Sequence, residues 1–121
     1  MATTVLVADD DADILRFVEI YLRMEGFDVV TACDGPDVLA KAAAVRPDLV
    51  LLDVLMPGLD GYAVCAQIRA DATLAAVPVI MVTANYVSAD VAAARRVGAD
   101  DFLVKPFDPL VLLDKAKALL S

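Results

Sequence analysis

Five short apolar segments, separated by stretches with helical periodicity, constrain this chain more than any other feature. The segments cover residues 5–8, 28–32, 49–53, 79–83 and 102–105. Four are rich in Val, Ile or Leu with little alternation, which is typical of strands buried on both faces, whereas segment 28–32 is the weakest and is expected nearer an edge. Strict alternation of strands and helices predicts an α/β fold with a parallel sheet covered by helices on both faces.

The stretches between these segments carry the signals of five helices. The expected helices cover about 12–24, 35–45, 61–70, 88–97 and 109–120. In the first, Ile14, Val18, Tyr21 and Leu22 form a core-facing stripe. Gly26 is placed to end that helix, and Asp108 to cap the last one. Ser88 is the expected cap of the fourth. The sequence contains no repeat or linker, and we therefore expect one domain over residues 1–121.

Composition excludes several classes of function. The net charge of −8 disfavours direct binding of nucleic acid, which needs a basic face. No apolar run is long enough to span a membrane, and the first four residues lack the basic region of a secretory signal, so we expect a cytoplasmic protein. Cys33 and Cys65 are interpreted as separate, buried, reduced thiols. The absence of histidine removes Ser-His and Cys-His nucleophile pairs, and any phosphohistidine donor must be another chain.

Chemically active side chains follow four of the five predicted strands. The set is Asp9, Asp10 and Asp11 after the first strand, Asp53 at the end of the third, Thr83 at the end of the fourth and Lys105 at the end of the fifth. Ligands of such sheets bind beyond the carboxyl ends of the strands. Three strands thus deliver an acid or a base to the edge where a ligand is expected, and a fourth delivers a hydroxyl.

The acidic groups at this edge predict a divalent cation. Two carboxylates about 4 Å apart repel each other by roughly 1 kcal/mol in water and about 4 kcal/mol at an effective dielectric near 20. Lys105 cannot neutralise Asp9, Asp10 and Asp53 together, and a site of few oxygen ligands favours Mg²⁺. If Asp53 attacks a phosphorus atom, the ion and Lys105 neutralise the phosphoryl oxygens, and the Thr83 hydroxyl can donate to one of them.

Each of these residues also has a simpler interpretation. Asp11 is better explained as a helix cap, and for Asp9 and Asp10 capping and ligand binding are equally good explanations. Asp or Thr at the end of a strand often forms a turn, and a lysine before proline is usually a surface residue. The simpler interpretations do not explain why all of these side chains meet at one edge.

Four segments of the sequence resemble the receiver domain of bacterial two-component response regulators. They are VLVADDDADI, DLVLLDVLMPGLDGYAV, VIMVTA and GADDFLVKPFDP, and the resemblance extends over the whole chain. The resemblance implies a single doubly wound (βα)₅ flavodoxin-like domain with strand order 2-1-3-4-5. It also implies a phosphoacceptor signalling switch that is not an enzyme beyond promoting its own phosphotransfer and dephosphorylation.

The resemblance assigns a role to each site residue. Asp53 is the implied phosphoacceptor and, with Asp10 and the backbone carbonyl of Leu55, a direct Mg²⁺ ligand, while Asp9 acts mainly through water. Thr83 and Lys105 contact the phosphoryl oxygens.

Other positions match the switch and the loops of the family. Phe102 occupies the aromatic switch position and turns inward with Thr83, and it stands where Tyr is common. Met56, Pro57, Asp60 and Gly61 match the loop after the acceptor. Pro106 matches a proline whose preceding peptide is typically cis.

The implied partners are a histidine kinase or histidine phosphotransfer protein as donor, and an output protein or output domain as receiver of the signal. The implied output surface is made of the fourth helix, the fifth strand and the fifth helix. In one subfamily this surface forms a dimer through charge pairs. Asp100, Asp101, Lys115 and Lys117 fit that pattern, whereas Val91, Arg96 and Val111 do not. Asn85 lies where receivers tune hydrolysis of the phosphoryl group.

Three alternatives stay open on the sequence alone. The chain can be a receiver cut from a longer regulator. A phosphatase of the haloacid dehalogenase type shares the Asp, Thr, Lys and Mg²⁺ set, but its nucleophile follows the first strand and its acidic pair comes late. A flavin-binding flavodoxin-like domain would need a phosphate-binding loop rich in Ser, Thr or Gly after the first strand, where Asp9, Asp10 and Asp11 stand.

Overall fold

A parallel sheet forms the centre of the molecule. The structure is a computed structural model and describes residues 3–54, 56, 58, 60–83 and 88–120. In this part of the chain, five strands lie in the order β2-β1-β3-β4-β5. The strands are β1 (Thr4–Ala8), β2 (Asp28–Ala32), β3 (Leu49–Asp53), β4 (Val79–Thr83) and β5 (Asp101–Val104), and the helices are α1 (Ala12–Met24), α2 (Gly35–Val45), α3 (Gly61–Ala70), α4 (Ser88–Arg96) and α5 (Pro109–Leu120). The predicted fold class and strand order are confirmed, and β2 lies at an edge as expected.

Most boundaries agree with those predicted, and β5 is the main exception. It covers Asp101–Val104, so Lys105 follows the strand instead of ending it. Pro106 explains this difference, because proline has no N–H to continue a ladder of hydrogen bonds. The α4 helix ends at Arg96, one residue before the expected end. The expected capping contact of Ser88 lies outside the described side chains. The peptide between Lys105 and Pro106 is cis, as the family resemblance implied.

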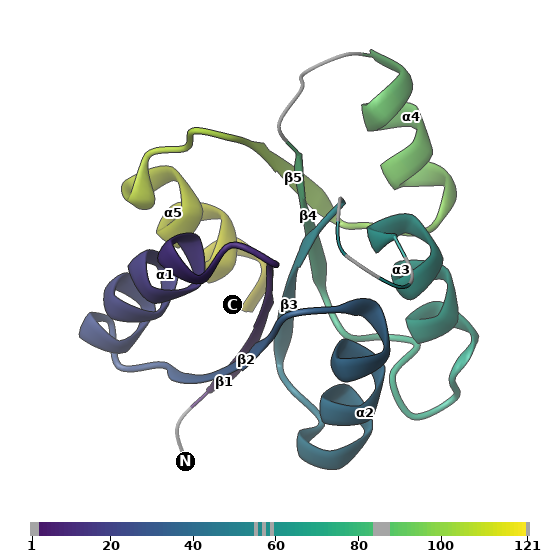
Figure 1. Ribbon diagram of the computed structural model, residues 1–121, viewed down its shortest axis with the longest axis horizontal. Helices are drawn as coiled ribbons and strands as arrows, with labels where there is room; N and C mark the ends of the chain where they lie inside the picture. The colour runs from purple at the N-terminus through teal and green to yellow at the C-terminus, as the bar shows by residue number, and fades with distance from the viewer. Residues whose placement is uncertain (1–2, 55, 57, 59, 84–87, 121) are drawn as a thin grey trace.

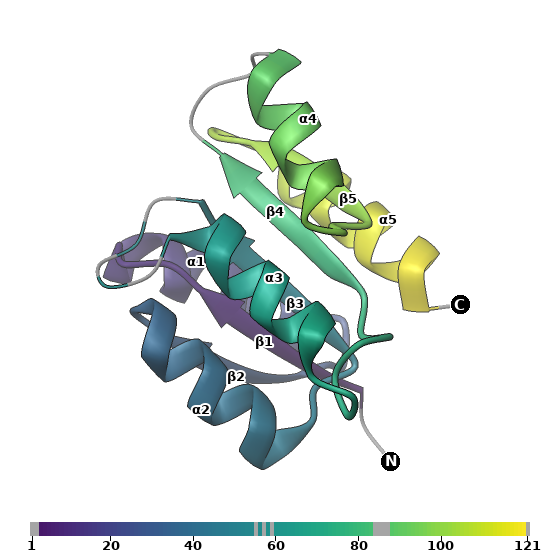
Figure 2. The ribbon, with the colours of Figure 1, turned by 90° about the vertical axis from the view of Figure 1, so that its right-hand side faces the viewer.

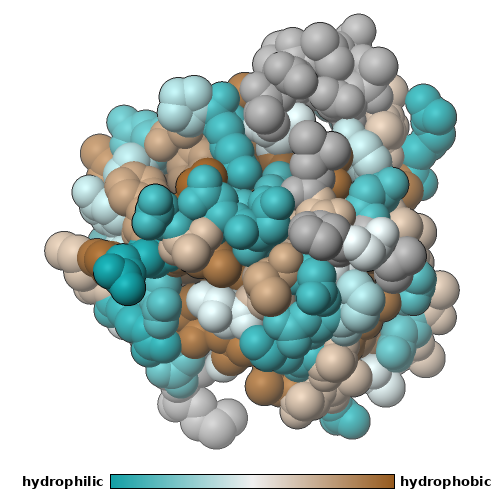
Figure 3. Space-filling model, in the orientation of Figure 1, coloured by the Kyte–Doolittle hydropathy of each residue, from teal (hydrophilic) through white to brown (hydrophobic). Residues whose placement is uncertain are grey.

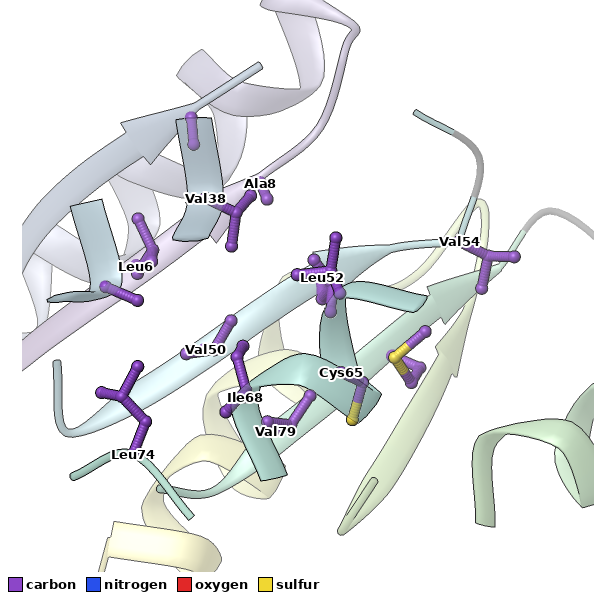
Figure 4. Packing of buried hydrophobic residues seen from close by; sticks show 14 of the residues in the cluster. Leu6, Ala8, Val38, Val50, Leu52, Val54, Cys65, Ile68, Leu74 and Val79 are labelled. Atoms are coloured by element: carbon purple, nitrogen blue, oxygen red, sulfur yellow. The ribbon is translucent and has the colours of Figure 1, made fainter. Parts of the chain in front are cut away.

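Helices cover both faces of the sheet (Figures 1 and 2). The α1 and α5 helices lie on one face, and α2, α3 and α4 lie on the other. Alternate side chains of each central strand therefore enter different cores. In β3, Leu49 and Leu51 pack with residues of α1 and α5, whereas Val50 and Leu52 pack with residues of α2 and α3. Figure 4 shows Leu52 and Val50 along β3, facing Ile68 and Cys65 of α3. Burial on both faces explains the continuous apolar runs of β1, β3 and β4.

Aspartates begin four of the helices at the carboxyl edge of the sheet. The Asp11 side chain accepts from the N–H groups of Asp13 and Ile14, which confirms its interpretation as the cap of α1. Asp34 and Asp60 cap α2 and α3 in the same way. Asp108 accepts from the Leu110 N–H and begins α5, as predicted. Every helix must start at this edge because each follows a strand that ends there, so the caps fix the helix starts beside the candidate site.

The two cysteines differ, and the expectation for one of them was wrong. Cys65 is fully buried, and its thiol donates to the carbonyl of Val97 at 3.4 Å. Burial raises the pKa of this thiol above its ordinary value. Cys33, which we expected to be buried, is exposed. It follows β2, the edge strand, where only one neighbouring strand is available to cover it.

The surface of the molecule is mixed in character. In Figure 3, hydrophilic and hydrophobic residues are interspersed over the face shown, with hydrophilic residues gathered near its middle. Among the residues that the structure describes, no helix is both long enough and apolar enough to cross a bilayer.

The end of α2 generates a prediction about stability. Arg46 caps this helix in the left-handed region, with φ 48° and ψ 69°. That conformation strains a non-glycine residue by about 1–2 kcal/mol, and glycine would relieve this strain. Glycine also loses more conformational entropy on folding, which offsets the relief by roughly 0.5–1 kcal/mol. Arg46→Gly should therefore raise the free energy of unfolding by about 0.5–1 kcal/mol in urea denaturation. Arg46→Ala removes the same side chain without relieving strain, and an equal gain in that variant would contradict the explanation.

Candidate functional site

The register of the sheet brings Asp9 and Asp53 together. In the pairing of β1 with β3, Ala8 lies opposite Leu52. Asp9 and Asp53 are each the next residue along their strands, so they emerge side by side at the carboxyl edge. The backbone N–H of Asp9 donates to Ala32 of β2 at 3.1 Å, which holds it in line with the strand. Both carboxylates are buried, with exposed fractions of 3% for Asp9 and 5% for Asp53.

Lys105 binds both buried carboxylates. Its Nζ lies 2.8 Å from Oδ2 of Asp9 and 3.2 Å from Oδ2 of Asp53. The backbone N–H of Lys105 donates to the carbonyl of Thr83 at 2.7 Å, which fixes the start of this side chain beside the end of β4. The other oxygen of Asp9 accepts from the N–H of Asp11 at 2.9 Å. Residues at the carboxyl ends of β1, β3 and β5 thus form one ionic network, as the sequence predicted.

The network carries more negative than positive charge. Asp9, Asp10 and Asp53 each offer a carboxylate oxygen, and these atoms lie within 4.8 Å of one another. Within this cluster three carboxylates face the single ammonium group of Lys105. Burial, followed by the nearby charge of Asp9, raises the pKa of Asp53 from 3.8 to about 6, against the opposing effect of Lys105. Burial alone would lower the pKa of Lys105, but its hydrogen bonds and charge pairing with Asp9 and Asp53 raise it.

The chemistry of the donor set fits a hard divalent cation. Mg²⁺ prefers oxygen ligands at 2.0–2.1 Å and keeps several waters. Two ligands of one such ion lie at most about 4.2 Å apart, so carboxylates within 4.8 Å need only small side-chain rotations to share it. Asp10 is exposed and gives the cluster a side open to solvent. Leu55, whose carbonyl the resemblance implied as a further ligand, lies outside the described residues.

Thr83 and Phe102 lie on the two strands beyond Asp53. Asp53 is in register with Val82, and Thr83 is the next residue of β4 and is buried. Phe102, in register with Met81, is partly buried and packs against the core on the side of α4. The Nζ of Lys115 lies 5.8 Å from the centroid of the Phe102 ring. Of the two positions implied as a switch, Thr83 therefore lies beside the site and Phe102 lies on β5, one strand further away.

The charged residues of the implied dimer surface have partners within the chain. Asp100 pairs with Arg69 at 2.8 Å, Asp101 with Lys115 at 2.9 Å, and Lys117 with Glu25 at 2.9 Å. Sequence reasoning placed Asp101 and Lys115 on this surface but missed that they bind each other beside Phe102. Their separation of 14 residues gives no local signal, because the contact joins a strand to the helix that follows it.

Known proteins share both the sequence pattern and the fold. The family model of the response regulator receiver domain matches residues 5–117. The chain belongs to this family. The receiver domain is 42% identical over 120 residues to the DNA-binding response regulator MtrA of Mycobacterium tuberculosis, which covers 99% of this chain and 51% of MtrA. It is 41% identical over 119 residues to the response regulator PleD of Caulobacter vibrioides, covering 98% of this chain and 26% of PleD.

The solved structures agree with this assignment. The chemotaxis response regulator CheY4 of Vibrio cholerae superposes with a TM-score of 0.94 at 33% identity, covering 99% of this chain and 100% of CheY4. The receiver domain spans about half the length of MtrA and about a quarter of PleD. Membership of the family makes this a signalling domain instead of a conventional enzyme and disfavours the phosphatase and flavin-binding alternatives.

The crowded carboxylates generate a prediction about stability and pH. Because the pKa of Asp53 in the folded receiver domain, about 6, lies above its ordinary value of 3.8, ionisation of Asp53 destabilises the fold. The resulting decrease in the free energy of unfolding is absent below about pH 4 and complete above about pH 6. In metal-free buffer, Asp53→Asn should therefore raise the free energy of unfolding at pH 7 by roughly 1 to 3 kcal/mol.

The dependence on pH separates this effect from a general change in packing. In urea denaturation, the difference between wild type and Asp53→Asn should grow as pH rises from about 4 to 6. Asp114→Asn removes an exposed carboxylate of α5 and serves as the control, with no such growth expected. A difference that stays constant over this range would be evidence against charge crowding.

Proposed function

We propose that this receiver domain, residues 1–121, accepts a phosphoryl group on Asp53 and thereby changes the surface formed by α4, β5 and α5. The proposal is carried by one observation, the sharing of Lys105 between the buried carboxylates of Asp9 and Asp53. A purely structural ion pair would need one carboxylate for one ammonium group. An excess of buried acidic groups at the ligand-binding edge of the sheet instead favours a site for a cation and a phosphoryl group.

Asp53 is the proposed nucleophile. One of its carboxylate oxygens forms a bond to phosphorus while the bond between phosphorus and a histidine nitrogen of the donor breaks, and the nitrogen keeps the electron pair. Asp10, Asp53 and the carbonyl of Leu55 would bind Mg²⁺ directly, and Asp9 through water. When bound, the ion supplies positive charge to the phosphoryl oxygens. Lys105 supplies further positive charge, because its Nζ already lies beside Asp53.

Charge at Asp53 is the proposed signal. Phosphorylation adds about −1.5 to −2 charges and three strong acceptor oxygens. These oxygens would compete with Asp9 for Lys105 and would accept from the Thr83 hydroxyl. Because Lys105 is hydrogen-bonded to the backbone of Thr83, both residues would respond together. Phe102, one strand away and partly buried, would then repack between two arrangements.

The proposed donor is a histidine kinase or a histidine phosphotransfer protein in the cytoplasm, and the proposed receiver of the signal is an output protein or an output domain. Loss of the phosphoryl group to water would reset the switch. A dimer through the output surface would require Asp101 and Lys115 to exchange their present partners. Control of another protein or domain is therefore the form of output that we propose first.

Labelling with a small phosphodonor tests the acceptor. Acetyl phosphate with Mg²⁺ should add one phosphoryl group to the wild-type chain and none to Asp53→Ala, because the attacking oxygen is then absent. Intact-mass measurement checks this result. Asp114→Ala, which removes an exposed aspartate of α5, is the matched control and should be labelled like wild type. Equal labelling of Asp53→Ala would reject Asp53 as the acceptor.

Removal of Lys105 tests the coupling of site and surface. Lys105→Ala should bind Mg²⁺ at least as tightly as wild type, because a competing positive charge is lost. When beryllofluoride is added as a phosphoryl mimic, NMR shift changes should stay near Asp53 in this variant and should reach β5 and α5 in wild type. Lys41→Ala on α2 is the control. Unchanged spread of the shifts in Lys105→Ala would show that Lys105 does not carry the signal.

A further inference from the structure

Gly61 lies directly against the backbone of the proposed acceptor. It is the first residue of α3 and is buried. A Cβ atom added to Gly61 would lie 2.9 Å from the Cα of Val54 and 3.0 Å from the carbonyl carbon of Asp53, and nearer still to the carbonyl oxygen of Asp53. Real Cβ atoms do not approach backbone atoms this closely, so any side chain here requires the backbone at Asp53 and Val54, the start of α3, or both to move.

The requirement for glycine at this position is one of space. Unlike Gly26, Gly58 and Gly98, Gly61 does not have a positive φ, and its helical conformation is open to any residue. The atoms that crowd it belong to the main chain, which cannot rotate aside as a long side chain can. Substitution of Gly61 therefore changes how the start of α3 packs against the peptide that follows Asp53, and backbone strain at residue 61 plays no part.

The peptide that joins Asp53 to Val54 is held between β4 and α3. The N–H of Val54 donates to the carbonyl of Val82 at 2.9 Å, and the N–H of Gly61 donates to the carbonyl of Val54 at 2.8 Å. Figure 4 shows Val54 beyond Leu52 at the end of β3. Asp60 fixes the first turn of α3 from the other side, because its carboxylate accepts from the N–H of Ala63 at 2.8 Å. The start of α3 thus packs directly against the backbone of Asp53.

We propose that Gly61 is a positioning residue that sets the direction of the Asp53 carboxylate by letting α3 begin against its peptide group. This inference rests on the proposed role of Asp53 as phosphoacceptor. A shift of about 1 Å at a reacting group can slow a reaction on the order of 100-fold. Gly61→Ala should therefore slow labelling of Asp53 by acetyl phosphate by roughly tenfold to a hundredfold, and should weaken Mg²⁺ binding several-fold.

A second glycine separates positioning from loss of stability. Gly26, at the end of α1, has φ +91° and nothing within 4 Å of an added Cβ atom. Gly26→Ala therefore strains the backbone away from the site without a collision. Labelling rates, Mg²⁺ affinity and urea denaturation are measured for both variants. Gly26→Ala should lose stability but keep both site properties within twofold of wild type. In metal-free Gly61→Ala, NMR shift changes should centre on Asp53, Val54 and Val82.

A pair of cap variants keeps the test decisive if Gly61→Ala does not fold. Asp60→Ala removes the cap that holds the first turn of α3, whereas Asp60→Ser removes the charge and keeps a capping oxygen. Asp34→Ala removes the equivalent cap of α2, in which Asp34 accepts from the Asp37 N–H at 2.7 Å. Labelling should be several-fold slower in Asp60→Ala than in Asp60→Ser or Asp34→Ala.

The outcomes distinguish this inference from the function on which it rests. If acetyl phosphate does not label Asp53 of the wild-type chain, the proposed function fails. If Asp53 is labelled in wild type and Gly61→Ala is labelled at the same rate with the same Mg²⁺ affinity, the positioning role is overturned. Where Gly61→Ala is unfolded, equal rates for Asp60→Ala and Asp60→Ser overturn it instead.

Discussion

One ammonium group held between two buried carboxylates determines the character of this domain. Burying a carboxylate is costly unless a partner compensates it, and here Lys105 serves both Asp9 and Asp53. Asp10 adds a third negative charge at the rim of the same cluster. The folded chain therefore retains an electrostatic conflict that simple replacement of an aspartate would relieve. Such a conflict at the ligand-binding edge of a sheet is expected of a site shaped for binding instead of for stability.

Parallel topology explains how residues so far apart in sequence come to share this lysine. All five strands point the same way, so every strand ends at one edge and every following helix begins there. The register of β1 with β3 fixes Asp9 beside Asp53. One strand, β4, lies between β3 and β5. Lys105 must therefore reach across the end of β4, and the hydrogen bond from its own N–H to Thr83 starts it in that direction. The sheet register and one long side chain are thus enough to bring Asp9, Asp53 and Lys105 together.

The sequence was most informative where local and long-range requirements agree. Continuous apolar runs predicted the strands, and helical periodicity with the end signals at Asp11, Gly26 and Asp108 predicted most helix bounds, because burial on both faces and capping are visible in neighbouring residues. The exposure of Cys33 was missed although the edge position of β2, the strand that it follows, was expected from the sequence. The pairing of Asp101 with Lys115 and the fit of Gly61 against Asp53 were not predictable, since both arise from contacts between elements whose spacing only the folded chain defines. Roles at the site itself came from the family resemblance and from charge crowding together.

The two ends of β4 and β5 are held in different ways, and this asymmetry bears on how a signal can travel. At the amino end, Arg69 donates to the carbonyls of Gly98 and Val77 and pairs with Asp100, whose carboxylate also accepts from the N–H of Val79. These contacts tie α3 to the starts of both strands through backbone carbonyls and one ion pair, at the end of the strands opposite Asp53. At the carboxyl end, Thr83 and Lys105 lie beside the acidic cluster, where a change of charge acts directly. If Asp53 is phosphorylated as we propose, the resulting movement should be largest at the carboxyl ends of β4 and β5 and should diminish toward Arg69. This gradient would favour movement of the β5 side chains that face α4 and α5.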